Sequence, residues 1–186
     1  MTHFLEREKT AVLVVDVQEG LLPQVENCGV VLSNIVKVVL GAQALAVSVE
    51  VAELRLEELG GTVGPLREII GAEKKSRVRS SFSCAKELPA AETWVLVGLE
   101  AHVSILQTAK ELRAQKRNVV VVNDAISSRS IYDFSTAIAE LKELGVRITS
   151  SETLLFELVG GVDDPAYEEI CSLTLGPAAV SGCGCC

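Results

Sequence analysis

The chain has 186 residues, a length that fits one domain with a sizeable buried core. Apolar residues make up 48% of it and aromatic residues only 4%, a mixture that suits a buried parallel sheet covered by helices better than a β-sandwich. The formal net charge of -8 argues against nucleic acid as the main partner, although a local basic patch is compatible with it.

No targeting or membrane-spanning segment is expected from the pattern of charges. The first ten residues include Glu6 and Glu8 and lack an apolar core, so they match neither a secretory signal nor a transit peptide. The most apolar stretch, residues 30–49, is interrupted by Asn34, Lys37 and Gln43 and predicts a core helix that runs into a strand. We therefore expect a cytoplasmic protein.

The cysteines do not form the framework of a secreted domain. Cys28, Cys84 and Cys171 are scattered, whereas the other three lie in the last four residues. We expect one domain over residues 1–175 and a flexible tail over residues 176–186, which is rich in Pro, Gly and Ala. The terminal cysteines resemble the doubly prenylated ends of Rab-type GTPases, so attachment to a membrane is expected only if these cysteines are lipidated.

In the first half of the chain, strands and helices are expected to alternate. A β-branched run that ends at Asp16 is typical of a central parallel strand. The expected elements are strands over 11–16, 47–52 and 76–78, a helix over 30–46, a loop over 57–64 and a short helix that ends at Lys86.

The second half continues the alternation more clearly. The expected elements are strands over 93–99, 119–122 and 146–148, and helices over 101–115, 132–144, 151–159 and 163–173. About six strands alternating with helices predict an α/β fold: three αβα layers around a mainly parallel, doubly wound sheet.

Three polar features follow expected strands. They are Asp16, the segment 100–104 and the segment 123–129. Ligands of such sheets bind beyond the carboxyl ends of the strands, so we expect a pocket at this edge.

The segment Val97–Thr108, which reads VGLEAHVSILQT, resembles the nucleophile turn of the isochorismatase-like cysteine hydrolase superfamily. In many members this turn reads GIEAHVCILQT. Three further stretches match the family in order, at residues 14–18, 124–130 and 149–152, and the resemblance covers roughly residues 10–173. It implies an αβα fold with a Rossmann-type strand order and, usually, a homo-oligomer.

The resemblance also implies a chemistry. In active members a triad of Asp, Lys and Cys cleaves C–N or vinyl-ether bonds of small molecules: the Asp takes the thiol proton, the Lys stabilises the thiolate and the Cys attacks from a helix N-terminus. Backbone amides of the turn, here those of Glu100 and Ser104, would hold the oxyanion. A cis peptide before Glu100 is also typical of the family.

Carried over to this chain, the triad is incomplete. Asp16 matches the acid, Ser104 stands at the position of the nucleophilic cysteine, and Arg79 stands at that of the lysine, which Lys75 could fill only if the preceding loop were longer. Glu53 is retained, but its neighbours differ from those of many relatives. The other residues that the resemblance places at the pocket are Gln18, Glu53, His102 and Arg129.

These replacements predict impaired catalysis. Serine is a far weaker acid than cysteine, and arginine holds its proton permanently, so Asp16 and Arg79 could simply pair. The leading hypothesis is a catalytically impaired protein that binds a small molecule or serves as a scaffold.

Other functions stay open at this point. One is an active hydrolase of a small amide, ester or vinyl ether that uses Ser104, Cys84 or a bound water. A ribonuclease role, as described for some relatives, and a membrane-tethered adaptor are the others. We expect no cofactor and no metal site, because the chain has only two histidines and no Cys–Cys spacing in its body.

Overall fold

Six strands form one sheet in the order β3-β2-β1-β4-β5-β6, in a computed structural model that describes residues 5–86 and 88–175. All neighbouring strands are parallel, which confirms the predicted α/β fold. The strands are β1 Thr10–Val15, β2 Ser48–Leu54, β3 Arg77–Arg79, β4 Thr93–Leu99, β5 Asn118–Ser127 and β6 Arg147–Thr149. The strand order reverses between β1 and β4, which is where ligands of doubly wound sheets bind.

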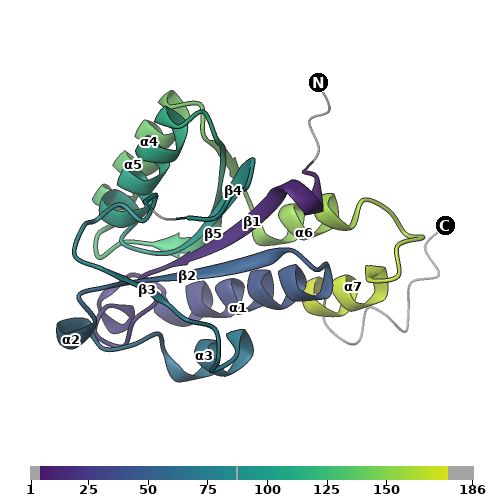
Figure 1. Ribbon diagram of the computed structural model, residues 1–186, viewed down its shortest axis with the longest axis horizontal. Helices are drawn as coiled ribbons and strands as arrows, with labels where there is room; N and C mark the ends of the chain where they lie inside the picture. The colour runs from purple at the N-terminus through teal and green to yellow at the C-terminus, as the bar shows by residue number, and fades with distance from the viewer. Residues whose placement is uncertain (1–4, 87, 176–186) are drawn as a thin grey trace.

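Helices cover both faces of the sheet (Figure 1). α4 and α5 pack on one face, and α1, α3, α6 and α7 pack on the other. The helices are α1 Cys28–Ala44, α2 Leu56–Leu59, α3 Gly64–Ile70, α4 Leu106–Ala114, α5 Ile131–Glu143, α6 Ser151–Val159 and α7 Tyr167–Leu175. Short 3₁₀ turns lie at Arg7–Lys9 and Leu22–Gln24, and a π-helical turn at Ala101–Ile105 precedes α4.

The core explains why β1 is a continuous apolar run. Val12 and Val14 face the layer of α1, whereas Leu13 and Val15 face the layer of α4 and α5, and all four are fully buried. A strand covered on both faces has no solvent side, so its sequence does not alternate with polar residues.

Gly98 brings β4 unusually close to β1. It has a φ of +134°, and a Cβ at this position would lie 2.0 Å from the carbonyl oxygen of Val15. Only glycine fits this conformation and this contact. The close approach lies just before the ends of both strands, so it sets how Asp16 and the nucleophile turn face each other.

Two predictions about the segment between β2 and β4 were wrong. Residues 57–64 are not one loop: α2 covers their first part and α3 begins at Gly64, with Pro65 at a position in the first helical turn where its missing N–H costs nothing. No helix ends at Lys86, because residues near it bond to α4 instead: the Cys84 amide donates to Thr108 and the Ser83 hydroxyl to Glu111.

The bounds in the second half also differ in places. β5 continues to Ser127 instead of ending at Val122. The register of its pairing with β4 shifts between Leu96 and Gly98, and Ile126 and Ser127 then pair with the last two residues of β4. α7 begins at Tyr167, four residues later than predicted. The tail over residues 176–186, with its three cysteines, lies outside the described residues. Within the described part, no helix is both long and apolar enough to cross a bilayer.

Candidate functional site

Asp16 lies where β1 ends, at the point where the strand order of the sheet reverses. Its φ is +54°, a left-handed conformation that is strained for a residue with a side chain. Arg55 and Glu100, which follow β2 and β4, share this conformation. Three neighbouring strands therefore end in strained charged residues, and backbone strain of this kind clusters at functional sites.

Arg79 binds Asp16 through both of its terminal nitrogens. Nη1 donates to Oδ1 at 2.9 Å and Nη2 to Oδ2 at 2.8 Å, and Nη2 also donates to the carbonyl of Phe82 at 3.2 Å. The Arg79 side chain is only 10% exposed and that of Asp16 is fully buried. Lys75, the alternative candidate for the lysine position, is exposed. The structure thus places Arg79, and not Lys75, against Asp16.

Ser104 completes the cluster from the π-helical turn. Its hydroxyl donates to Asp16 Oδ2 at 2.6 Å, and the residue is 1% exposed. Its amide donates to the carbonyl of Glu100 at 3.0 Å, so this N–H is already bonded and is not directed at an oxyanion, in contrast to what the resemblance implies. The peptide bond before Glu100 is trans, unlike the cis bond typical of the family.

Asp16 and Arg79 shift each other's pKa, and Ser104 affects the pKa of Asp16. Burial raises the pKa of the Asp16 carboxyl, while the hydrogen bonds and charge of Arg79 and the hydroxyl of Ser104 oppose that rise. Burial by itself would lower the pKa of Arg79, but the hydrogen bonds and charge of Asp16 outweigh it and raise that pKa. The guanidinium therefore keeps its proton and cannot act as an acid or a base.

Glu100, Arg129 and His102 form a second polar network beside the cluster. Arg129 donates to both oxygens of Glu100 at 3.0 Å, and its own side chain is 53% exposed. His102 Nδ1 lies 3.0 Å from the hydroxyl of Ser128. Arg129 thus holds the strained residue at the start of the nucleophile turn, and His102 links this turn to the end of β5.

Gln18 and Glu53, which the resemblance places at the pocket, are bonded within the loop that follows β2. Gln18 is fully buried and bonds to the backbone of Leu54 and Gly60, and Glu53 accepts from the amide and the hydroxyl of Thr62. Their polar groups are directed at the backbone after β2. They shape this loop instead of facing a ligand.

Cys84 lies close to the cluster, which its position in the sequence does not show. It is 4% exposed, and its amide donates to Thr108 Oγ1 at 2.9 Å. Burial raises the pKa of its thiol to about 11, although the nearby Arg79 opposes this effect. The thiol is therefore neutral near pH 7 and is a poor nucleophile in this state.

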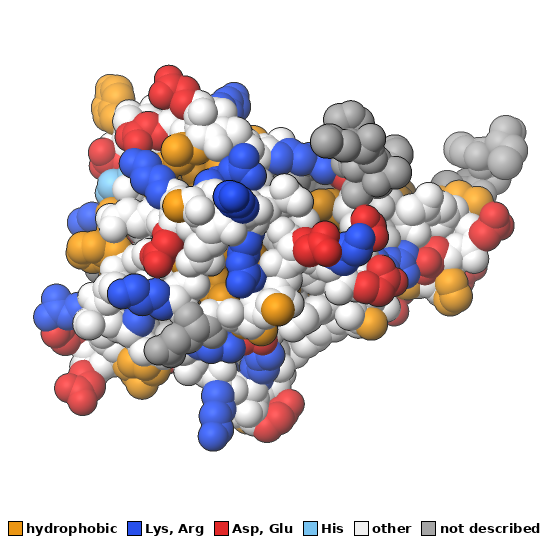
Figure 2. All heavy atoms as spheres, turned by 45° about the horizontal axis from the view of Figure 1, so that its top comes forward, with side chains coloured by type: hydrophobic (Ala, Val, Ile, Leu, Met, Phe, Trp, Pro, Cys, Tyr) orange, Lys and Arg blue, Asp and Glu red, His pale blue; other side chains and the backbone are white. Residues whose placement is uncertain are grey.

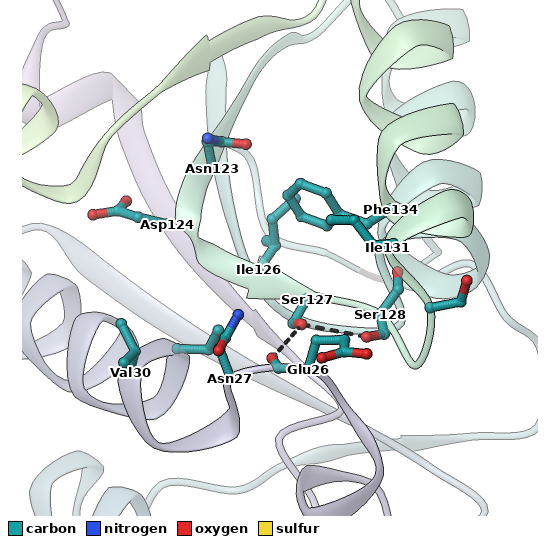
Figure 3. Close-up of a pocket in the computed structure, with 12 residues that line it drawn as sticks. Glu26, Asn27, Val30, Asn123, Asp124, Ile126, Ser127, Ser128, Ile131 and Phe134 are labelled. Carbon is teal, nitrogen blue, oxygen red and sulfur yellow. Dashed lines mark hydrogen bonds between the residues drawn. The ribbon is translucent and has the colours of Figure 1, made fainter.

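A pocket of about 220 Å³ lies at the end of β5, between the starts of α1 and α5 (Figure 3). Figure 3 shows the Ser127 hydroxyl bonded to the backbone of Glu26 and Ser128 at the base of this pocket. Neither Asp16 nor Ser104 lines it. This pocket is formed by the 123–130 segment with α1 and α5, apart from the buried cluster. A second pocket at the same edge, of about 480 Å³, is lined by residues 55–58 and 78–80, which include Arg79.

Asp124 is bonded within the fold, because its two oxygens accept from the amide and the hydroxyl of Ser151. Residues 5–86 and 88–175 contain no group of three or more side chains that could hold a metal ion.

Comparison with known proteins identifies the family. The isochorismatase domain model matches residues 84–153. Isochorismatase domain-containing protein 2 of Pongo abelii is 33% identical over 175 residues, which cover 90% of this chain and 83% of the relative. The chain belongs to the isochorismatase domain family.

One further relative and two solved structures are also similar to this chain. Isochorismatase domain-containing protein 1 of Salmo salar is 34% identical over 173 residues, and this match covers 90% of the chain but only 61% of that longer relative. The structure of the MAR1 ribonuclease from Caenorhabditis elegans has a TM-score of 0.88 at 30% identity, with 94% of each chain covered. The Escherichia coli YcaC gene product, described as an octameric hydrolase of unknown specificity, shares the fold at a TM-score of 0.84 and 16% identity.

Proposed function

We propose that this isochorismatase-family protein is catalytically impaired and acts by binding a small molecule or as a scaffold. The observation that carries this proposal is that both carboxylate oxygens of the buried Asp16 already accept hydrogen bonds from neighbouring side chains. Its two carboxylate oxygens accept two hydrogen bonds from Arg79 and one from Ser104, and no part of the residue is exposed.

A base in this state is poorly suited to activate a serine. A hydroxyl is a much weaker acid than a thiol, so removing its proton needs a strong base. Burial raises the pKa of Asp16, but Arg79 opposes this rise, and a carboxylate stays a far weaker base than a serine alkoxide. The Ser104 amide, which would stabilise an oxyanion, is bonded to Glu100. Burial of both side chains also keeps a substrate from the hydroxyl.

The pocket between β5, α1 and α5 supports a binding role. It combines apolar walls such as Ile126 and Phe134 with hydroxyl and amide groups, a mixture typical of small-molecule sites. A homo-oligomer and a cytoplasmic location stay predictions for this chain.

An active hydrolase that uses Ser104 is the alternative, and the short bond between its hydroxyl and Asp16 is the observation in its favour. A ribonuclease activity, as in the name of the Caenorhabditis elegans relative, would need a free base and a free acid. The cluster offers neither, and we do not propose RNA cleavage.

The test measures hydrolysis of nicotinamide, short amides and vinyl ethers, first with the wild-type protein and then with the double variant Ser104→Cys, Arg79→Lys. We expect no wild-type turnover above background. In the double variant, the introduced thiol should react with iodoacetamide at least about tenfold faster than Cys28, because an ammonium and a helix N-terminus lower a thiol pKa. Ser104→Cys alone, with Arg79 retained, is the matched control.

Wild-type turnover that is lost in Ser104→Ala would overturn the proposal and make the protein a serine hydrolase. Turnover that persists in Ser104→Ala would overturn it as well, by locating catalysis at another group.

A further inference from the structure

The charges of this chain are distributed very unevenly. Two segments, residues 74–86 and 110–117, contain nine of the 17 Lys and Arg residues but only one of the 25 acidic residues, so together they carry a net charge of +8. The other 165 residues contain eight basic and 24 acidic residues, a net charge of -16. We call the basic residues of the two segments the basic face: Lys74, Lys75, Arg77, Arg79, Lys86, Lys110, Arg113, Lys116 and Arg117.

The fold brings the two segments together. The chain after β3 runs along α4, where the Ser83 hydroxyl donates to Glu111. Arg117 Nη1, beyond the end of α4, donates to the carbonyls of Pro89 and Ala91 at 2.9 and 3.1 Å. Figure 2 shows the result as a band of Lys and Arg side chains down the face turned to the viewer.

Five of these cations are not neutralised by a carboxylate. Lys74 and Arg77 pair with Glu50, Arg79 pairs with Asp16, and Lys110 pairs with Glu140. Arg113 and Arg117 donate only to backbone carbonyls, which leave their charge uncompensated. Within the described ranges, no carboxylate pairs with the exposed side chains of Lys75, Lys86 and Lys116.

Phe82 adds an aromatic ring to this charge. It is 49% exposed and lies between Lys75 and Lys86 in the chain, and its carbonyl is held by Arg79. An exposed ring on a segment that carries uncompensated cations is a combination that suits single strands, because cations contact phosphates while a base stacks on the ring.

We propose that the basic face binds single-stranded nucleic acid, with Phe82 as a stacking platform and without cleavage of the strand. The acidic remainder of the molecule limits this binding to one face and keeps it sensitive to salt. The proposal goes beyond the small-molecule or scaffold role and does not depend on it.

The experiment measures fluorescence anisotropy of labelled 15-nucleotide oligo(U) RNA and oligo(dT) DNA at 50 to 200 mM NaCl. Both should bind, since phosphates and base faces are common to them. Five phosphate contacts predict a slope of log K against log salt of about -3.5, so binding should weaken about 100-fold over this range.

Two variants separate the contributions. Neutralising three lysines in Lys75→Gln, Lys86→Gln, Lys116→Gln should reduce the slope to about -1.4. Phe82→Ala should weaken binding by at least about fivefold while leaving the slope unchanged, because it removes stacking and no charge. The matched control, Lys9→Gln, Lys37→Gln, Lys142→Gln, changes the net charge equally but leaves the basic face intact and should bind like the wild type.

Absence of binding at 50 mM NaCl would overturn the proposal, as would equal losses in the two triple variants. Binding to vesicles of 70% phosphatidylcholine and 30% phosphatidylserine without binding to either oligonucleotide would identify the face as a membrane surface instead. None of these variants changes Asp16, Arg79 or Ser104, so the outcome is independent of the hydrolysis test.

Discussion

Arg79 contacts Asp16 through two parallel N–H···O bonds, a geometry that the single charged nitrogen of a lysine cannot provide. Asp16 Oδ2 nevertheless also accepts from the Ser104 hydroxyl. The arginine adds a bond to the carbonyl of Phe82, so it also fixes the loop that follows β3. One substitution thus changes both the electrostatics and the rigidity of the site.

The reactivity of Cys84, which lies near Asp16 and Arg79, tests how burial affects the pKa of a thiol at this site. Its thiol pKa, raised by burial from 9.0 to about 11, predicts about 100-fold less thiolate near neutral pH than an ordinary thiol has. We expect its alkylation by iodoacetamide at pH 8 to be at least about 100-fold slower in the native protein than in the unfolded chain, as measured by peptide mapping. Similar native and unfolded rates would show that the thiol is exposed or ionised.

Glu157 predicts a pH dependence of stability. Arg147 donates to both of its oxygens and the Leu5 amide donates to Oε1, and these bonds, above all those of Arg147, lower the pKa of Glu157. The carboxylate therefore stabilises the fold above the unfolded-state pKa of about 4.3, and this contribution is lost as the pH falls through the lower folded-state pKa.

We expect Glu157→Gln to lower the free energy of unfolding by about 1 kcal/mol at pH 7, and by much less at pH 3, in urea titrations. Glu143→Gln, at an exposed position of α5, is the control and should show no such difference. An equal loss from Glu157→Gln at both values of pH would mean that the charge of Glu157 is not what stabilises the fold.

At the scale of elements, the approach of β4 to β1 depends on Gly98. Gly98→Ala would place a methyl group 2.0 Å from the Val15 carbonyl oxygen and impose a strained φ of +134°. We expect a loss of roughly 3 kcal/mol or more, measured by thermal or urea unfolding.

Gly29→Ala is the matched control for this substitution. Gly29 lies in the first turn of α1, where an added Cβ meets no atom within 4 Å, and alanine favours helix. The free energy of unfolding of the Gly29→Ala protein should stay the same or rise by up to about 1 kcal/mol. A Gly98→Ala protein as stable as Gly29→Ala would show that β4 can move away from β1 at little cost.

At the scale of the whole molecule, we predict a homo-oligomer. Family members usually assemble, and large apolar side chains such as Val30, Ile131 and Tyr132 are 64%, 60% and 81% exposed around the 220 Å³ pocket. Sedimentation velocity at micromolar concentration should give a mass of at least twice the 19.8 kDa chain. A 19.8 kDa species alone would contradict the prediction.

The sequence by itself determined the layers of the fold and the family. β4 has the predicted bounds, and α6 likewise, because a buried strand and a capped helix carry local signals: apolar runs, an N-cap at Ser150 and a terminator at Gly160. The resemblance, which matches positions along the chain, also singled out Asp16, Arg79 and Ser104, and the structure brings these three into hydrogen-bond contact. Their catalytic roles stay a prediction. Local signals failed for residues 80–86, whose conformation depends on hydrogen bonds to α4, more than twenty residues away.

Only the tertiary structure decided what these residues contact. That Arg79 binds both oxygens of Asp16, and that the Ser104 amide is already bonded, depends on how β3, β2, β1 and β4 end along one edge of the sheet. The basic face has the same origin. Net charge is a sum over the chain and loses all information about position, whereas folding places residues 74–86 beside 110–117 and concentrates their charge on one surface.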